Sequence, residues 1–548
     1  MYDFVVVGSG FGGSVSALRL AQKGYRVAVI EEGRRFGPDD FPETTWDARR
    51  YHFMPRLGCH GIQRMDLLRH ALVVGGAGVG GGSLVYGNTL FEPLAPFFEL
   101  PRIRSLGGAA TLRPYYELCR RMMGVTPNPR LFEPDRLLRE TAGEYGRAET
   151  FTPSPVGVFF GDSERPTADP YFLGEGPARQ GCNCCGGCFV GCRYDAKNSL
   201  DRNYLYLAEQ LGVEVIPQVK VTAVEAVRDG FVVHSRDSTT LGLRRRRTYR
   251  AEQVVVAAGV MGSLRLLLRS QRLGGLPRLS GRLGFDVRTN SESILGVMAP
   301  PGTDFSKGIA ASSSVFPDEH TQVQADRYPA GSDTMGLLST LLVPGDGLLP
   351  RPVRWLGEKL RHPWVAAQAV SPRGFAQRSI VLVVMQDLDS SFRLVERRLP
   401  FGGAVLGSEA DAAPIPSYIP IANDFAERLA RRVGGVALSS ITEVLLDAPA
   451  TAHILGGCVI GDGPEEGVVD SQHRAFGHPG LRVADGSVIP ANLGVNPALS
   501  ILAFAERAMS FVPTRKGRPM RFLEVDRAWG VQDLLLPPRQ DAERRTPA

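Results

Sequence analysis

The chain has 548 residues, of which 43% are hydrophobic and 22% charged, a balance typical of a globular protein with room for more than one domain. The formal net charge of +6 is small for this length, and no basic block indicates a nucleic-acid partner. No run of about 18 apolar residues would cross a membrane, and the first strand begins too early to leave room for a signal peptide. We therefore expect a cytoplasmic protein that is at most peripheral to a membrane.

The first 40 residues predict a strand–helix–strand unit that binds a dinucleotide. An apolar strand, Phe4–Val7, leads into a G-x-G-x-x-G motif, and a second strand, Arg26–Ile30, ends at Glu31. The glycines let a pyrophosphate approach the helix N-terminus, and the acid accepts from ribose hydroxyls and disfavours NADP. FAD and NAD both remain open at this point. The motif residues are Gly8, Gly10, Phe11, Gly12 and Gly13.

The rest of the chain predicts an α/β protein with two interleaved domains. Strand-like runs such as Ser379–Met385 alternate with Pro- and Gly-rich loops over residues 290–445, which indicates a mainly antiparallel sheet covered by helices. We assign residues 1–40, 195–290 and 462–515 to a Rossmann-like FAD-binding domain. Residues 41–194 and 291–461 form the substrate domain, and 516–548 form a tail over the surface.

Two further patterns favour FAD. Residues 75–83 hold six glycines, so backbone must pass close to a flat group such as a flavin ring. Near the C-terminus, Gly494-Val495-Asn496-Pro497 opens a long apolar helix, whose positive end suits the negative charge of a reduced flavin. His453 begins a second motif, His453-Ile454-Leu455-Gly456-Gly457-Cys458.

The order of these motifs resembles the glucose–methanol–choline (GMC) oxidoreductases, and within them the bacterial cholesterol oxidases. The resemblance implies noncovalent FAD and oxidation of a secondary alcohol, the 3β-hydroxyl of a sterol being the first choice. His453 would take the hydroxyl proton, and Asn496 would orient the hydroxyl. The cofactor contacts implied are Gly76, Gly81, Gly82, Ser83, Val219, Asp485, Gly486, Asn496 and Pro497, besides the first motif and Glu31.

The resemblance also implies an acid that moves a proton during Δ5 to Δ4 isomerisation. The nearest counterpart is Asp389, with Asp387 as a competitor, and the isomerase step stays open. Oxygen is the expected electron acceptor. The alternatives are a dehydrogenase for another hydrophobic alcohol, passing electrons to an iron–sulfur cluster or a quinone, and a redox-neutral flavin isomerase.

Two segments carry separate hypotheses. Cys182, Cys185, Cys188 and Cys192 have the spacing of bacterial iron–sulfur ligands. The alternative interpretation is a tight turn whose cysteines are free thiols. The segment 351–364, with Trp355 and Leu356, could lie on a membrane that holds the substrate, or it could be an ordinary surface helix.

Overall fold

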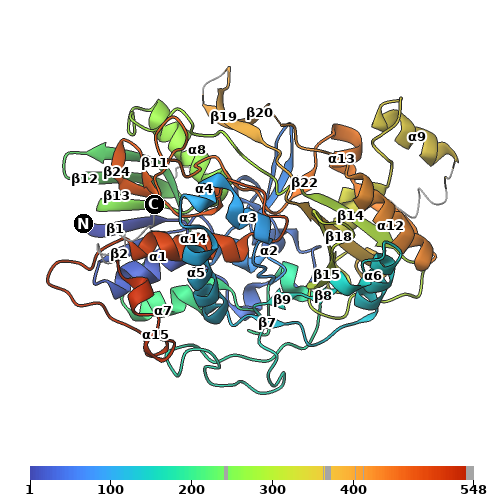
Figure 1. Ribbon diagram of the computed structural model, residues 1–548, viewed down its shortest axis with the longest axis horizontal. Coiled ribbons are helices and arrows are strands. Elements are labelled where there is room, and N and C mark those ends of the chain that lie inside the picture. Colours follow the sequence, from blue (N-terminus) through green and yellow to red (C-terminus); the bar gives the residue numbers. More distant parts are fainter. Residues whose placement is uncertain (240–244, 362, 364–371, 401–402, 412, 539–548) are drawn as a thin grey trace, which may run out of the picture.

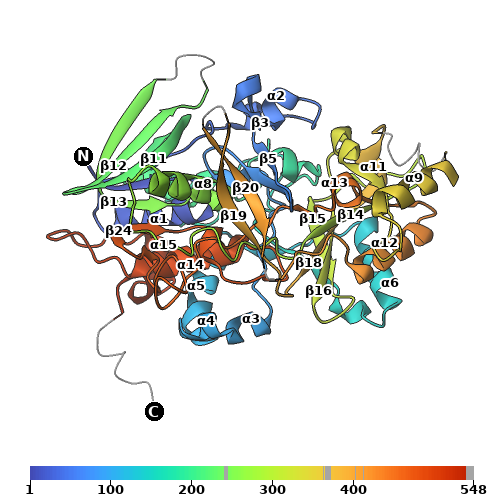
Figure 2. The same ribbon diagram turned by 90° about the horizontal axis from the view of Figure 1, so that it is seen from above.

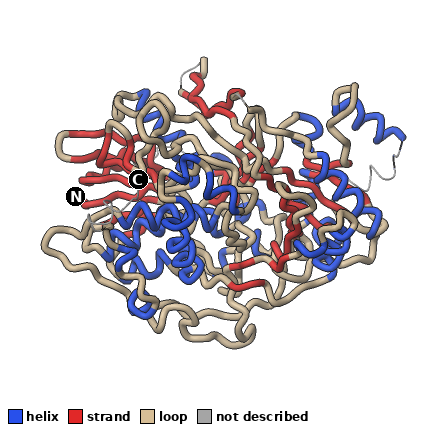
Figure 3. Tube along the Cα trace, in the orientation of Figure 1, coloured by secondary structure: helices blue, strands red, loops and turns tan. Residues whose placement is uncertain are grey.

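The computed structural model describes residues 1–239, 245–361, 363, 372–400, 403–411 and 413–538. Two sheets lie toward opposite ends of the molecule, each flanked by helices (Figures 1 and 3). The predicted α/β class is therefore confirmed. The helices are α1 (Phe11–Gln22), α2 (Ala48–Tyr51), α3 (Ala95–Glu99), α4 (Pro101–Arg104), α5 (Gly108–Met122), α6 (Glu133–Gly143), α7 (Tyr204–Gln210), α8 (Gly259–Arg272), α9 (Arg351–Arg361), α11 (Phe375–Arg378), α12 (Pro420–Arg432), α13 (Ile441–Leu446), α14 (Ala498–Ser510) and α15 (Glu524–Ala528).

The first sheet has eight strands around a parallel centre. Its strands are β1 (Tyr2–Val7), β2 (Val27–Ile30), β10 (Glu214–Ile216), β11 (Val219–Val227), β12 (Gly230–Asp237), β13 (Arg246–Val256), β23 (Arg474–Ala475) and β24 (His478–Val483). β1 runs parallel to β2 on one side and to the end of β13 on the other, and β11 to β13 form an antiparallel meander. Because β1 is buried on both faces, its last four residues, Phe4–Val7, are all apolar.

The second sheet is antiparallel throughout and has seven strands, in the order β17–β21–β14–β18–β16–β15–β8. They are β8 (Thr152–Pro153), β14 (Ser293–Met298), β15 (Ala311–Val315), β16 (Thr321–Asp326), β17 (Ser339–Leu341), β18 (Ser379–Gln386) and β21 (Val436–Ser440). One face packs Val297, Leu382 and Val384 against Phe425 of α12. Since side chains alternate along a strand, the intervening residues must face the other way, toward the site described below.

Short strands connect the two sheets. β6 (Leu72–Gly76) pairs with β5 (Gln63–Leu67) and runs parallel to β22 (Ala450–Thr451), which brings the glycine-rich run beside residues 450–453. The ribbon β19 (Phe392–Arg398) and β20 (Ala404–Ala410) rises between the two sheets (Figure 2). The remaining pairs are β3 (Phe53–Met54) with β4 (Cys59–His60), and β7 (Thr126–Pro127) with β9 (Pro155–Val156).

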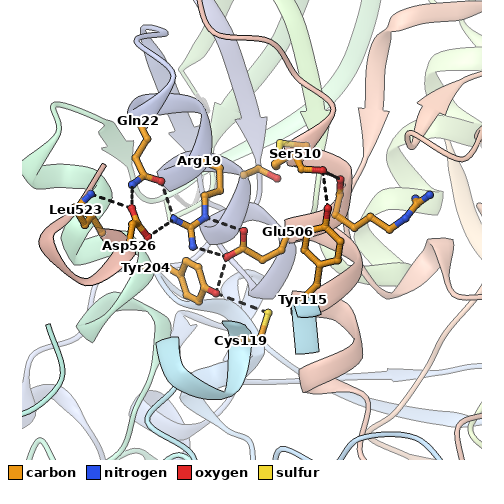
Figure 4. A network of polar contacts seen from close by, with 12 residues as sticks. Arg19, Gln22, Tyr115, Cys119, Tyr204, Glu506, Ser510, Leu523 and Asp526 are labelled. Carbon is orange, nitrogen blue, oxygen red and sulfur yellow. Dashed lines mark hydrogen bonds and ion pairs between the residues drawn. The ribbon is translucent and has the colours of Figure 1, made fainter. Parts of the chain in front are cut away.

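The segment expected as a surface tail is in part buried. Asp526 of α15 is fully buried and pairs with Arg19 of α1, whose guanidinium also donates two 2.8 Å hydrogen bonds to Glu506 of α14 (Figure 4). Gln22 donates to Asp526, and the Tyr204 hydroxyl donates to Glu506. A charge network of this kind joins residues distant in sequence, so the Arg- and Pro-rich composition of the segment gave no sign of it.

Two other sequence expectations concern surfaces. None of the described helices is long and apolar enough to span a bilayer. Helix α9 projects from the end of the molecule, and none of its side chains is buried (Figure 1). Trp355 is tied to the protein by a 2.7 Å hydrogen bond from its indole N–H to the Thr340 hydroxyl. Trp364, the last residue of the predicted surface segment, lies outside the described residues.

Candidate active site

A cavity of about 290 Å³ opens along the carboxyl ends of the parallel strands. This is where a doubly wound sheet binds nucleotides. Most of the predicted cofactor residues form its walls: Gly8, Gly10, Phe11, Gly12, Glu31, Gly76, Gly81, Gly82, Val219, Asp485 and Gly486.

The geometry of the glycines fits a dinucleotide cradle. A Cβ atom on Gly12 would lie 1.5 Å from the Ala484 carbonyl oxygen, and one on Gly81 would lie 2.6 Å from the Gly10 Cα. These close contacts therefore require glycine at positions 12 and 81. Gly13 is not in the cavity wall; its Cβ would strike the Gly8 carbonyl oxygen at 2.1 Å, so it serves the packing of α1 on β1.

Glu31 also holds the two glycine-rich turns together. Its carboxylate accepts hydrogen bonds from the Ser9 hydroxyl at 2.7 Å, from the Gly33 N–H at 2.8 Å and from the Gly78 N–H at 3.3 Å. Burial raises the pKa of Glu31, and the bonds from Gly33 and Ser9 oppose that rise. The carboxylate can still face a ribose from the cavity wall, since each oxygen has more than one lone pair.

Sequence reasoning missed an ionic cluster at the same end of the cavity. Glu32 pairs with Lys220 at 2.5 Å and with Arg64 at 3.4 Å. Asp66 pairs with Arg64 at 2.7 Å and with Arg265 at 3.2 Å. All five line the cavity, and they come from four separate segments, so no local motif could reveal them.

A second cavity of about 260 Å³ adjoins the first. Its floor is the inner face of the antiparallel sheet, where Ile294, Gly296, Val381 and Val383 alternate with the residues that pack on α12. The apolar lining suits a hydrophobic substrate. The wall common to both cavities consists of Phe11, Val74, Gly75, Gly76, Gly82, Ala452, Ile454 and Ile501.

The two predicted catalytic residues meet in the second cavity. The His453 Nε2 and Asn496 Nδ2 atoms are 3.3 Å apart, and the same amide donates to the Gln324 Oε1 at 3.3 Å. Asn496 Oδ1 is buried and has no hydrogen-bond partner within the described ranges. Pro497, also in the cavity wall, is followed directly by α14, which directs the helix N-terminus at the site.

Besides Gly13, two predicted residues lie outside the cavity walls. Ser83 is outside both cavity walls; its hydroxyl donates to the Gly80 carbonyl at 2.7 Å and accepts from the Leu200 N–H. The Asp389 side chain is 81% exposed, forms an ion pair with Arg288, and lines neither cavity. Asp389 lies three residues after the end of β18, and its exposed side chain is not part of the cavity wall that holds His453.

The structure instead brings two other carboxylates into the second cavity, Glu292 and Asp326. Asp326 lies two residues after Gln324 on β16, so both face the cavity. Burial raises the pKa of Asp326 well above its usual range, and Glu292 adds to this while Arg327 opposes it. The one sequence signal for Asp326 was an acidic residue two positions after Gln324 in β16, a strand that is buried along its whole length.

The cysteine cluster does not support the iron–sulfur hypothesis. Among the described residues, no group of three or more His, Cys, Asp or Glu side chains is arranged to hold a metal ion. Cys182, Cys185, Cys188 and Cys192 line one small cavity. Lys197 crosses the loop and donates to three backbone carbonyls, including that of Cys188.

Comparison with known proteins agrees with this geometry. Residues 178–278 and 409–505 match models of the GMC oxidoreductases, and residues 6–60 match an NAD(P)-binding Rossmann-like domain. The chain is 46% identical to a cholesterol oxidase of Mycobacterium tuberculosis over 94% of this chain and 91% of that protein. It is 42% identical to a cholesterol oxidase of Acinetobacter baumannii, over 94% and 95% of the two chains.

The chain belongs to the GMC oxidoreductase family. It is therefore an FAD-dependent oxidoreductase that acts on CH–OH donors. The fold resembles that of the crystal structure of pyridoxine 4-oxidase from Mesorbium loti, which aligns with a TM-score of 0.57 at 14% identity and covers 92% of this chain and 97% of that one.

Proposed function

We propose that this GMC oxidoreductase oxidises the 3β-hydroxyl group of cholesterol or a related sterol to the ketone, with oxygen as electron acceptor. The observation that carries the proposal is the His453–Asn496 pair in an apolar cavity that shares a wall with the dinucleotide cavity. The identity of 42–46% to cholesterol oxidases supports the sterol as substrate.

The chain's own residues supply binding, orientation and proton transfer. FAD, held noncovalently in the first cavity, would supply the hydride acceptor and the means of reducing oxygen. His453 accepts the hydroxyl proton at Nε2, a role suited to imidazole near neutral pH. Asn496 fixes the hydroxyl oxygen beside it, and the apolar sheet face excludes water from the sterol rings.

We further propose that Asp326, rather than Asp389, performs the isomerisation. A carboxylate that shuttles a proton from C4 to C6 of the steroid must face the same cavity as His453, and Asp326 does. Its Oδ1 is buried and has no hydrogen-bond partner in the part of the chain that the structure describes. Asp326→Asn should still reduce the flavin while releasing the Δ5 ketone; release of the Δ4 ketone at the wild-type rate would contradict the assignment.

The test of the main proposal is anaerobic reduction of the purified yellow protein by a panel of sterols and other alcohols. Cholesterol should bleach the flavin bands, and air should restore them with formation of peroxide. A dehydrogenase would bleach but reoxidise only with a quinone or dye. A redox-neutral isomerase would convert a Δ5 ketone with no bleaching by any alcohol.

The exposed face of α9 suits access to sterol in a bilayer. Val353, Leu356 and Leu360 are each more than half exposed and recur at helical spacing, with Lys359 and Arg361 beside them. We propose that this face rests on the membrane surface while sterol enters the cavity. An apolar face flanked by basic residues is the pattern of an interfacial helix.

A further inference from the structure

Behind the catalytic histidine lies a buried carboxylate to which the proposed function gives no role. Glu292 is fully buried immediately before β14 and reaches the wall of the second cavity. Its Oε2 accepts from the Ala452 N–H at 2.9 Å and from the Thr451 hydroxyl at 2.7 Å. The same oxygen lies 3.1 Å from Nδ1 of His453, although the ring does not yet align an N–H bond with it.

The segment that carries Glu292 also restrains the loop that leads to Asn496, the other proposed catalytic residue. Asn290 accepts at Oδ1 from the Leu493 and Gly494 N–H groups, at 2.7 and 3.0 Å, and donates from Nδ2 to the Val495 carbonyl at 2.8 Å. These bonds fix the loop that ends at Asn496. Asn290 and Glu292 belong to one buried turn. They thus contact the two segments that carry the proposed catalytic residues, one leading to Asn496 and the other to His453.

The backbone of this turn is strained, which is typical of functional segments. Asn290 and Ser291 have φ angles of 60° and 43°, in the left-handed region that non-glycine residues rarely adopt. Such conformations cost free energy and persist where the surroundings hold them. Both residues are buried, and the hydrogen bonds of Asn290 supply that restraint.

We propose that Glu292 is a positioning residue that holds His453 with its proton on Nδ1 and its Nε2 lone pair toward the substrate. The contacts of Asn496 agree, because Nδ2 at 3.3 Å can donate only to an unprotonated Nε2. When the substrate oxygen transfers its proton to Nε2 and the carbinol carbon gives its hydrogen and the C–H electron pair to the hydride acceptor that FAD would supply, the new imidazolium faces the Glu292 carboxylate across Nδ1. Apo geometry of such hydrogen bonds is commonly loose and tightens with substrate bound.

The inference rests on the proposed use of His453 as the proton acceptor, and the experiment separates the two. The wild-type holoenzyme is first reduced anaerobically with cholesterol, or with whichever alcohol of the panel bleaches it; failure of cholesterol alone rejects the sterol and leaves Glu292 open to measurement with the other alcohol. Glu292→Gln keeps the shape but removes the charge, and Glu292→Asp keeps the charge. Glu443→Gln is the matched control, since Glu443 is also buried beside β14 but lies outside both cavity walls.

The experiment measures two quantities, the limiting rate of flavin reduction and the substrate concentration that gives half that rate. We expect Glu292→Gln to lower the limiting rate about 10- to 100-fold, as losses of residues that orient an active group do, with the half-saturating concentration and FAD content near wild type. Glu292→Asp should recover part of the rate, and Glu443→Gln should be unchanged. Wild-type rates in Glu292→Gln, or equal losses in Glu443→Gln, would overturn the proposal. If Glu292→Gln yields no holoenzyme, Glu292→Asp decides: a several-fold slower limiting rate supports the role and a wild-type rate overturns it.

Discussion

Gly10→Ala should weaken FAD binding without destabilising the fold. Gly10 has φ −71° and ψ −164°, a conformation that alanine adopts, and the nearest atom to an added Cβ is the Gly81 Cα at 4.0 Å. The substitution should therefore leave the apoprotein's free energy of unfolding unchanged or raise it by about 0.4–1 kcal/mol, as Gly to Ala changes do where strain is absent. The added methyl would project into the cavity where the diphosphate approaches α1.

Crowding of this kind costs about 1–3 kcal/mol, which corresponds to roughly 5- to 150-fold weaker FAD binding. The assay is titration of the apoprotein with FAD, followed by flavin fluorescence, together with thermal unfolding of the apoprotein. Gly281→Ala is the control, because its Cβ meets nothing within 4 Å and it lines neither cavity. Wild-type FAD affinity in Gly10→Ala, with the fold intact, would refute the placement of the diphosphate.

Three further outcomes are expected. Burial raises the pKa of Glu443 from 4.5 to about 7, so the native state loses about 3 kcal/mol of stability as pH rises between these values. Glu443→Gln should remove this part of the pH dependence. If the free energy of unfolding changes equally between pH 5 and 8 in the wild type and the variant, the assignment is contradicted. Asp526→Ala breaks a fully buried pair with Arg19 and should lower the free energy of unfolding by about 3 kcal/mol in urea; an unchanged midpoint would show that the tail is not anchored there. Replacing both Leu356 and Leu360 by glutamate should reduce co-sedimentation of the protein with sterol-containing vesicles but leave turnover of detergent-dispersed sterol unchanged. Wild-type co-sedimentation in this variant would reject the membrane face.

The cofactor half of the site was predictable because its signals are local. Gly8 to Gly13 and Glu31 belong to one strand–helix–strand unit, whose geometry follows from a short motif. His453 and Asn496 were identified through the resemblance to a family, and the structure brings them within 3.3 Å across 43 residues. Spacing along the chain could not have shown that contact.

The acids of the second cavity were not predictable in the same way. Whether Asp326 or Asp389 faces the substrate depends on strand register, and a shift of one residue reverses every side chain. β16 directs Gln324 and Asp326 inward, whereas Asp389 follows the end of β18 and lies in solvent. Glu292 depends on a strained turn that has no sequence signature, and the cysteine spacing alone could not show that, among the described residues, the thiols are not arranged to hold a metal ion.

The central claim, oxidation of a sterol 3β-hydroxyl, is tested most directly by anaerobic titration of the holoenzyme with cholesterol and with its 3α-epimer. The two differ only in the direction of the hydroxyl and hydride that His453 and Asn496 must address. We predict that the 3β-alcohol bleaches the flavin bands and that the epimer does not. An oxidised spectrum that cholesterol leaves unchanged, while a different alcohol bleaches it, would contradict the account.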